Sequence, residues 1–259
     1  MTEVALRPRP VVPTAVVAGV LAAAAAGWLV LVGRTTGMYT GPGGDPGTLG
    51  WFAATWAVMT VAMMLPASAP AVLRLARARG STGAVLFVVG YGLVWMVAGL
   101  AGYWVVQSVR DLHAGAMAWS SAGRYVAGAA VAAAGLYQLT GAKRRWLARC
   151  AAPDRPRVRP GIAGALLAGT EHGCCCVACC WTLMVALYAL GMMSIAWMAM
   201  LTVLIAGERL VPWRTIGVRG VAVVLVVLGV AVAATPAAVP ALTVPAKGGA
   251  AMIGMSMGR

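Results

Sequence analysis

Long apolar stretches separated by short polar or basic segments follow one another from residue 11 to residue 239. A helix that crosses the roughly 30 Å apolar core of a bilayer needs about 20 such residues. Seven stretches approach or exceed this length: Val11–Val32, Trp51–Leu73, Ala84–Val106, Ala122–Gly141, Ile162–Leu190, Ile195–Val211 and Val221–Val239. The pattern predicts an all-α, polytopic transmembrane helix bundle with about seven spans.

Two of these stretches leave an alternative open. The first follows Arg7 and Arg9 and would be lost, leaving six spans, if it were a cleaved signal peptide. Its apolar run is longer than that of a signal peptide and more spans follow, so we expect a retained helix. The stretch Ile162–Leu190 exceeds one perpendicular span, which predicts either a tilted helix or a separate half-helix over Ile162–Thr170.

Composition supports a membrane protein. The 259 residues are 61% hydrophobic and 10% charged, and the mean hydropathy is +0.87. Soluble domains are nearer half apolar and a quarter charged. We therefore expect residues 1–10 to form a cytoplasmic tail, residues 11–239 a transmembrane domain and residues 240–259 a flexible, Met-rich extracytoplasmic tail.

The net charge of +14 comes from basic residues whose positions along the chain predict the membrane topology. Fifteen of the 20 basic residues fall in segments that a seven-span layout places on one side: Arg7, Arg9, Arg74, Arg77, Arg79, Lys143, Arg144, Arg145, Arg149, Arg155, Arg157, Arg159, Arg209, Arg214 and Arg219. The positive-inside rule makes that side the cytoplasm, which predicts an N-in, C-out arrangement in contact with the lipid bilayer. The sequence has neither a Gly-rich phosphate loop nor basic–aromatic interleaving, so we expect no nucleic-acid partner.

Candidate chemistry is concentrated in residues 171–181, which read EHGCCCVACCW. At 100° per residue on a helix, five side chains share a stripe about 140° wide, and Cys174 lies on the opposite side. These side chains are His172, Cys175, Cys176, Cys179 and Cys180. Thiolates select Cu(I), zinc or iron–sulfur clusters over hard cations. Cysteine also serves as a small packing residue, but five in seven positions favour a metal site.

Methionines provide a second set of candidate ligands. Met59, Met63 and Met64 lie near the middle of the second predicted span, and Met59 and Met63 repeat one helix face. The tail ends MIGMSMGR and carries three more candidates, Met252, Met255 and Met257. A thioether is a weak, neutral ligand that suits Cu(I). Pro66, just beyond the first set, predicts a kink in that helix.

The chain resembles a bacterial family of predicted metal-binding integral membrane proteins, a domain family of unknown function. The similarity covers roughly residues 50–235 and is carried by WAVMTVAMMLPAS, GYGLVW, AGLYQLTGAK and HGCCCVACCWTLM. The resemblance implies metal binding by His172 with Cys176, Cys179 and Cys180, and by the MxxxMM element. It also implies a place in the bacterial cytoplasmic membrane. The family usually has a cysteine pair after the YQ segment, whereas this sequence has only Cys150 in that region.

Taken together, these features predict a Cu(I)-handling membrane protein that transports copper or delivers it to a membrane enzyme or chaperone, and not an enzyme. Two alternatives stay open. A membrane thiol–disulfide oxidoreductase would use the C-x-x-C pair Cys176 and Cys179. A structural zinc site would use His172 with three thiols. Gly-rich spans permit close helix contacts, including contacts between copies in an oligomer.

Overall fold

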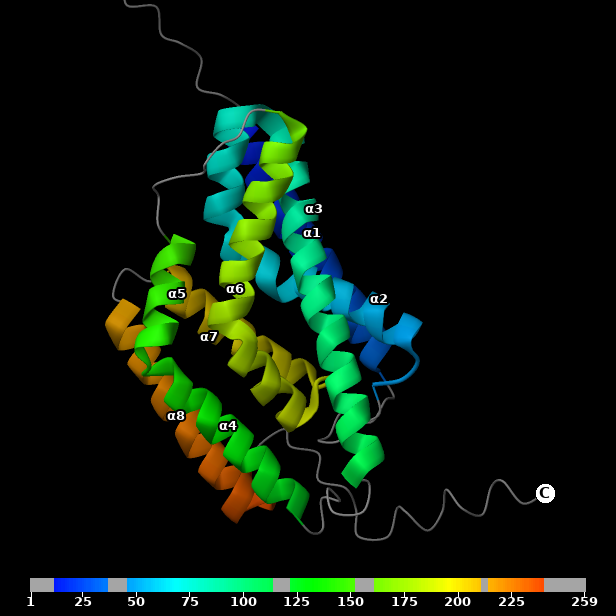
Figure 1. Cartoon of the computed structure of the whole chain (residues 1–259), viewed down its shortest axis with the longest axis vertical. Helices are drawn as coiled ribbons and strands as arrows, with labels where there is room; N and C mark the ends of the chain where they lie inside the picture. The colour runs from blue at the N-terminus through cyan, green and yellow to red at the C-terminus, as the bar shows by residue number, and fades with distance from the viewer. Residues whose placement is uncertain (1–11, 37–45, 114–121, 152–160, 211–213, 240–259) are drawn as a thin grey trace, which may run out of the picture.

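The computed structural model describes residues 12–36, 46–113, 122–151, 161–210 and 214–239. Every regular element in these segments is helical (Figure 1). The elements are α1 (Val12–Thr35), α2 (Leu49–Met59), the π-helix η1 (Thr60–Met64), α3 (Leu65–His113), α4 (Arg124–Gln138), α5 (Gly141–Ala151), α6 (Ile162–Gly191), α7 (Ile195–Leu210), α8 (Arg214–Ala234) and the 3-10 turn η3 (Pro236–Ala238). The predicted all-α class is confirmed.

Helix α3 is two helices joined at a glycine. Gly80 has φ 71° and ψ −170°, a backbone conformation that glycine adopts without steric cost. In Figure 1 the chain rises through residues 65–79 and descends through residues 81–113. The predicted spans Trp51–Leu73 and Ala84–Val106 therefore lie on the two sides of this break.

Four helical stretches of the described residues are long and apolar enough to cross a membrane, compared with the seven predicted spans. They are Thr14–Thr35, Leu49–Arg110, Ile162–Gly191 and Ile216–Ala234, and the second contains two of the predicted spans. The predicted spans Ala122–Gly141 and Ile195–Val211 correspond to α4 and α7, which have 15 and 16 residues. At 1.5 Å per residue these helices reach roughly 22–24 Å, short of a full apolar core.

Helix α6 is continuous over 30 residues, which excludes the separate half-helix. Gly191, with φ 113°, ends it and turns the chain into α7. Along its length α6 packs against α3, whereas α4 packs against α8. Two glycines allow the α3–α6 contact: a Cβ at Gly90 would overlap the carbonyl of Leu166, and one at Gly169 would overlap that of Phe87. Small residues let membrane helices approach this closely.

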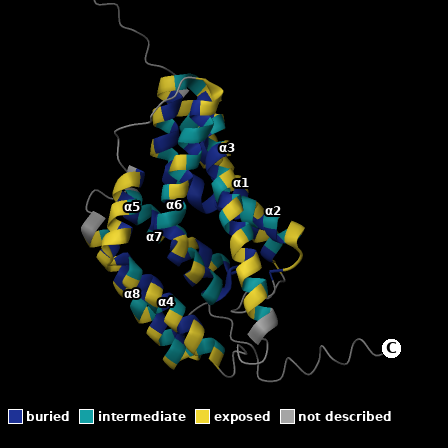
Figure 2. Ribbon diagram, viewed as in Figure 1, coloured by how far each residue is buried: buried dark blue, intermediate teal, exposed yellow. Residues whose placement is uncertain are grey.

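Buried residues lie mainly on the inner faces where the helices meet, and exposed residues lie on the outer faces (Figure 2). Many of the exposed side chains are large and apolar, among them Val97, Val203 and Val223. An apolar outer surface is expected where lipid replaces water. The core beneath it brings together sulfur atoms from η1, α6 and α7.

Candidate metal centre

Three cysteines of α6 point into the core of the bundle. Cys176 and Cys179 are 0% exposed and Cys180 is 1% exposed, while Cys174 is exposed and Cys175 is half-buried. The predicted helix face is therefore the one that turns inward, and Cys174 lies on the outer side. The sulfur atoms of Cys179 and Cys180 are 3.5 Å apart. The Cys179 thiol donates to the carbonyl of Cys176 at 3.2 Å.

Arg209 of α7 binds this cysteine group through a single nitrogen. Its Nη2 atom lies 2.9 Å from the sulfur of Cys176, 3.1 Å from that of Cys179 and 3.6 Å from that of Cys180. One nitrogen that contacts three sulfurs covers one side of the triangle they form. The carboxylate of the adjacent residue, Glu208, points in a different direction, as neighbouring positions on a helix do.

Glu208 instead forms an ion pair with Lys143 of α5. The Nζ atom of Lys143 lies 2.7 Å from Oε2 of Glu208, and the two side chains are 0% and 1% exposed. The same Nζ atom donates to the carbonyl of Cys179 at 2.7 Å. Burial alone would lower the pKa of Lys143, but the negative charge of Cys180 and of Glu208 raises it, so the amine stays a cation. The ammonium group of Lys143 therefore links α5 to both α6 and α7 next to the cysteines.

Cys150 of α5 joins the cysteines of α6. It is buried, and its sulfur lies 3.9 Å from the sulfur of Cys179. Half-buried Cys175 also interacts with it. The contact with Cys179 lowers the pKa of the Cys150 thiol against the opposing effect of burial, and the charge of Arg209 acts in the same direction. The sequence did not predict this contact, because Cys179 lies on a different helix, 29 residues further along the chain.

The methionine element forms a widened helical turn. Residues Thr60–Met64 are π-helical, and the N–H of Leu65 donates to the carbonyl of Thr60, five residues back. Pro66 has no N–H to donate, which accounts for the local loss of the α-helical pattern just before it. Met63 and Met64 are buried in this turn. The predicted irregularity is therefore a π-turn at the methionines.

Tyr91 connects the methionine turn to the cysteines. Its hydroxyl lies 3.4 Å from the carbonyl of Met64 and 3.1 Å from the sulfur of Cys176. A hydroxyl has a single proton to donate. If Cys176 loses its proton to become a thiolate, Tyr91 has to donate to that sulfur instead of to the carbonyl.

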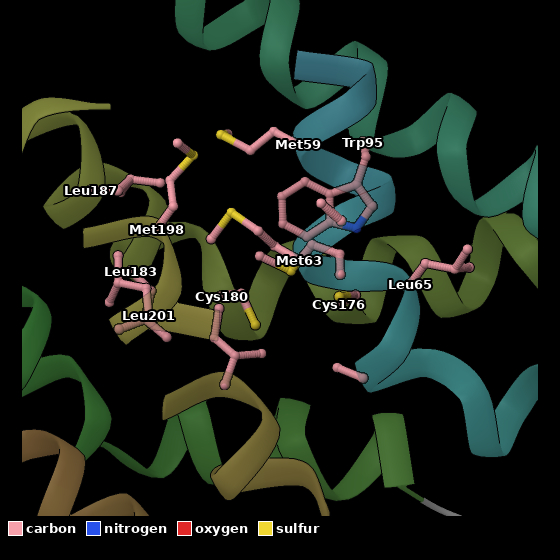
Figure 3. Close-up of a cluster of buried hydrophobic side chains, with 14 of the residues drawn as sticks. Met59, Met63, Leu65, Trp95, Cys176, Cys180, Leu183, Leu187, Met198 and Leu201 are labelled. Carbon is pink, nitrogen blue, oxygen red and sulfur yellow. The ribbon is translucent and has the colours of Figure 1, made fainter. Parts of the chain in front are cut away.

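Three thioethers meet above the cysteines. Figure 3 shows the sulfur ends of Met59, Met63 and Met198 pointing toward one another, with Cys176 and Cys180 nearby. All five side chains belong to one buried cluster. Met198, from α7, was not among the predicted ligands because the sequence does not show which face of α7 meets η1.

His172 lies among aromatic side chains. Its ring packs against those of Phe87 and Tyr91, with centroids 5.5 Å and 5.9 Å away. Its Nε2 atom is buried without a hydrogen-bond partner. Three further predicted ligands, Met252, Met255 and Met257, lie outside the described residues.

Thiols and thioethers, which are soft ligands, therefore lie close together in the core. Their present arrangement does not form a complete coordination site for a metal ion. Within the described segments, no three His, Cys, Asp or Glu side chains are already positioned to hold one. Arg209 and Tyr91 hydrogen-bond to the sulfurs instead. Thiols with adjacent thioethers are the donor set that suits Cu(I), so the residues fit that ion chemically.

The sequence contained signals for three residues to which it gave no role at the site. Tyr91 lies in the GYGLVW motif and Lys143 ends the AGLYQLTGAK motif, so the resemblance singled out both segments without a role. Arg209 is an ionisable residue at the end of an apolar helix, a placement that indicates function by default in membrane proteins. Their common role is to contact the cysteine segment of α6.

A comparison with known protein families identifies the family to which the chain belongs. The chain belongs to the PpoB2 family, described as copper chaperones, whose model matches residues 53–232. The match includes the methionine turn, the cysteines and Arg209. It agrees with the metal-binding family that the sequence motifs resembled. No curated protein and no solved structure matches the chain.

Proposed function

We propose that this protein binds Cu(I) in its buried sulfur cluster and delivers it to a copper-requiring acceptor, such as a membrane enzyme or another chaperone. One observation carries the proposal: the sulfurs of Cys176, Cys179 and Cys180 all lie near the same nitrogen of Arg209. These cysteines share their buried core with methionine thioethers. The family description, copper chaperone, supports the choice of metal.

The combination of ligands suits delivery better than storage. Thiolates bind Cu(I) tightly, whereas thioethers are neutral and bind it weakly. An ion that is to be passed on needs several sites, each weak enough to release it. Met59, Met63 and Met198 provide such weak ligands next to the thiols. Met64, in the same π-turn, is joined to Cys176 through Tyr91.

We also propose a placement in the bacterial cytoplasmic membrane, with residues 1–10 inside and residues 240–259 outside. Four membrane-length helical stretches and the one-sided basic charge support it. In this arrangement α4 and α7 complete the bundle as shorter helices. Met252, Met255 and Met257 would then collect or hand over copper at the outer face.

The test is a competition titration of the full chain, purified reduced in detergent, against the Cu(I) chelator bathocuproine disulfonate. We expect the wild type to remove Cu(I) from the chelator and a Cys176/Cys179/Cys180→Ser triple variant to lose this ability. The matched control is Cys174→Ser, which changes an exposed thiol on the same helix, two positions before Cys176. Wild-type protein that leaves all Cu(I) with the chelator would refute the proposal.

A thiol–disulfide oxidoreductase remains the second candidate, because the sulfurs of Cys150 and Cys179 lie 3.9 Å apart on different helices. The two functions differ in their dependence on the thioethers. Copper delivery predicts that Met59→Leu with Met63→Leu slows transfer of Cu(I) to an acceptor chelator. Disulfide exchange predicts no effect of these changes and loss of activity in Cys176→Ser or Cys179→Ser.

A further inference from the structure

We propose that Arg209 makes the buried sulfur site selective for monovalent Cu(I) over divalent Zn(II). This inference rests on the proposed function, since it concerns the site at which Cu(I) would bind. Zinc is the natural competitor because thiolates bind both ions well. The cysteine segment alone does not distinguish the two ions.

The first part of the argument is the position of the guanidinium group. Its Nη2 atom lies 2.9–3.6 Å from the sulfurs of Cys176, Cys179 and Cys180 and so covers one side of the sulfur triangle. Structural zinc sites are tetrahedral and need a fourth ligand beyond the plane of any three. Arg209 excludes a fourth ligand on its side. Cu(I) is satisfied by two or three sulfurs, so it does not need that position.

The second part is charge. With three thiolates, bound Cu(I) leaves a net charge of −2 and bound Zn(II) leaves −1. The guanidinium cation therefore attracts the copper complex about twice as strongly. The neighbouring charges of Lys143 and Glu208 offset each other across 2.7 Å. The charge on Arg209 is thus the one that acts on the metal complex.

The size of the effect follows from Coulomb's law. One unit of charge at about 4 Å, with an effective dielectric constant of about 20, changes a binding constant by roughly a thousandfold. Arg209 is partly buried, and screening by solvent reduces this figure. We expect Arg209 to contribute a factor of about 100 to the preference for Cu(I) over Zn(II).

The experiment measures both affinities in full-length protein purified in detergent. Cu(I) is titrated against bathocuproine disulfonate and Zn(II) against the chelator 4-(2-pyridylazo)resorcinol. Arg209→Gln, which removes the charge, should reduce the ratio of Cu(I) to Zn(II) affinity by about 100-fold. Arg209→Lys, which keeps the charge, should stay within about tenfold of the wild type. The control Arg144→Gln removes an exposed charge on α5 and should leave the ratio unchanged.

An affinity ratio in Arg209→Gln that stays within about threefold of the wild type would overturn the inference while leaving Cu(I) binding intact. A Lys variant that behaves like the Gln variant would overturn it as well, since charge would then not be the cause. If Arg209→Gln does not fold, Arg209→Met removes the same charge from a side chain of similar length. Wild-type protein without any Cu(I) affinity would instead refute the proposed function.

Discussion

Replacing Lys143 by methionine should destabilise the fold around the cysteines of the candidate metal centre. The change removes the cation from an ion pair in which both side chains are almost fully buried. It also deprives the carbonyl of Cys179 of its side-chain donor. Glu208 would be left without a partner for either oxygen, because its Oε1 atom already has none.

The expected cost is large. Breaking a buried pair by removing one partner costs about 3–5 kcal/mol, because an uncompensated charge stays in the core. For a chain of this size each kcal/mol lowers Tm by roughly 2–4 °C. We therefore expect Lys143→Met to lower Tm by roughly 6–20 °C, measured by tryptophan fluorescence of detergent-purified protein.

A double variant separates the buried charge from simple loss of packing. Lys143→Met with Glu208→Met replaces the pair by two apolar side chains, a change that is often neutral for buried ion pairs. It should recover more than half of the lost stability. The control Arg144→Met alters the adjacent exposed residue of α5 and should change Tm by less than about 2 °C. Additive losses in the double variant, or a loss below about 1 kcal/mol in the single variant, would refute the reasoning.

Three further variants test other contacts. Gly169→Ala places a Cβ on the carbonyl of Phe87 and should cost about 1–3 kcal/mol in thermal unfolding, whereas Gly92→Ala, with open space around it, should not. Tyr91→Phe removes the hydroxyl next to Cys176 and should weaken Cu(I) binding roughly fivefold in the competition titration; an unchanged affinity would exclude that contact from the bound state. Cys150→Ser should slow Cu(I) loading in stopped-flow measurements and change the equilibrium affinity by less than about threefold, because Cys150 lies between half-buried Cys175 and buried Cys179. Equal loading rates in Cys150→Ser and wild type would show that Cys150 takes no part in Cu(I) loading.

The sequence by itself determined the class of fold and the kind of chemistry. Long apolar runs are typical of helices that can cross a bilayer, where backbone groups find no other partner, so an all-α fold with membrane-length helices could be predicted from hydropathy alone. The 3.6-residue period placed Cys176, Cys179 and Cys180 on one face and Cys174 on the other, and burial agrees with it. Thiol and thioether groups favour a soft metal ion such as Cu(I).

Only the tertiary structure decided which residues act on those thiols. Arg209, Lys143 and Cys150 reach the cysteines from α7 and α5, and nothing in their spacing along the chain encodes a contact between helices. The break at Gly80 also required the structure, since an apolar run does not show where its backbone reverses. Local periodicity fixes the face that a side chain occupies on its own helix, whereas the packing of helices fixes what that face meets.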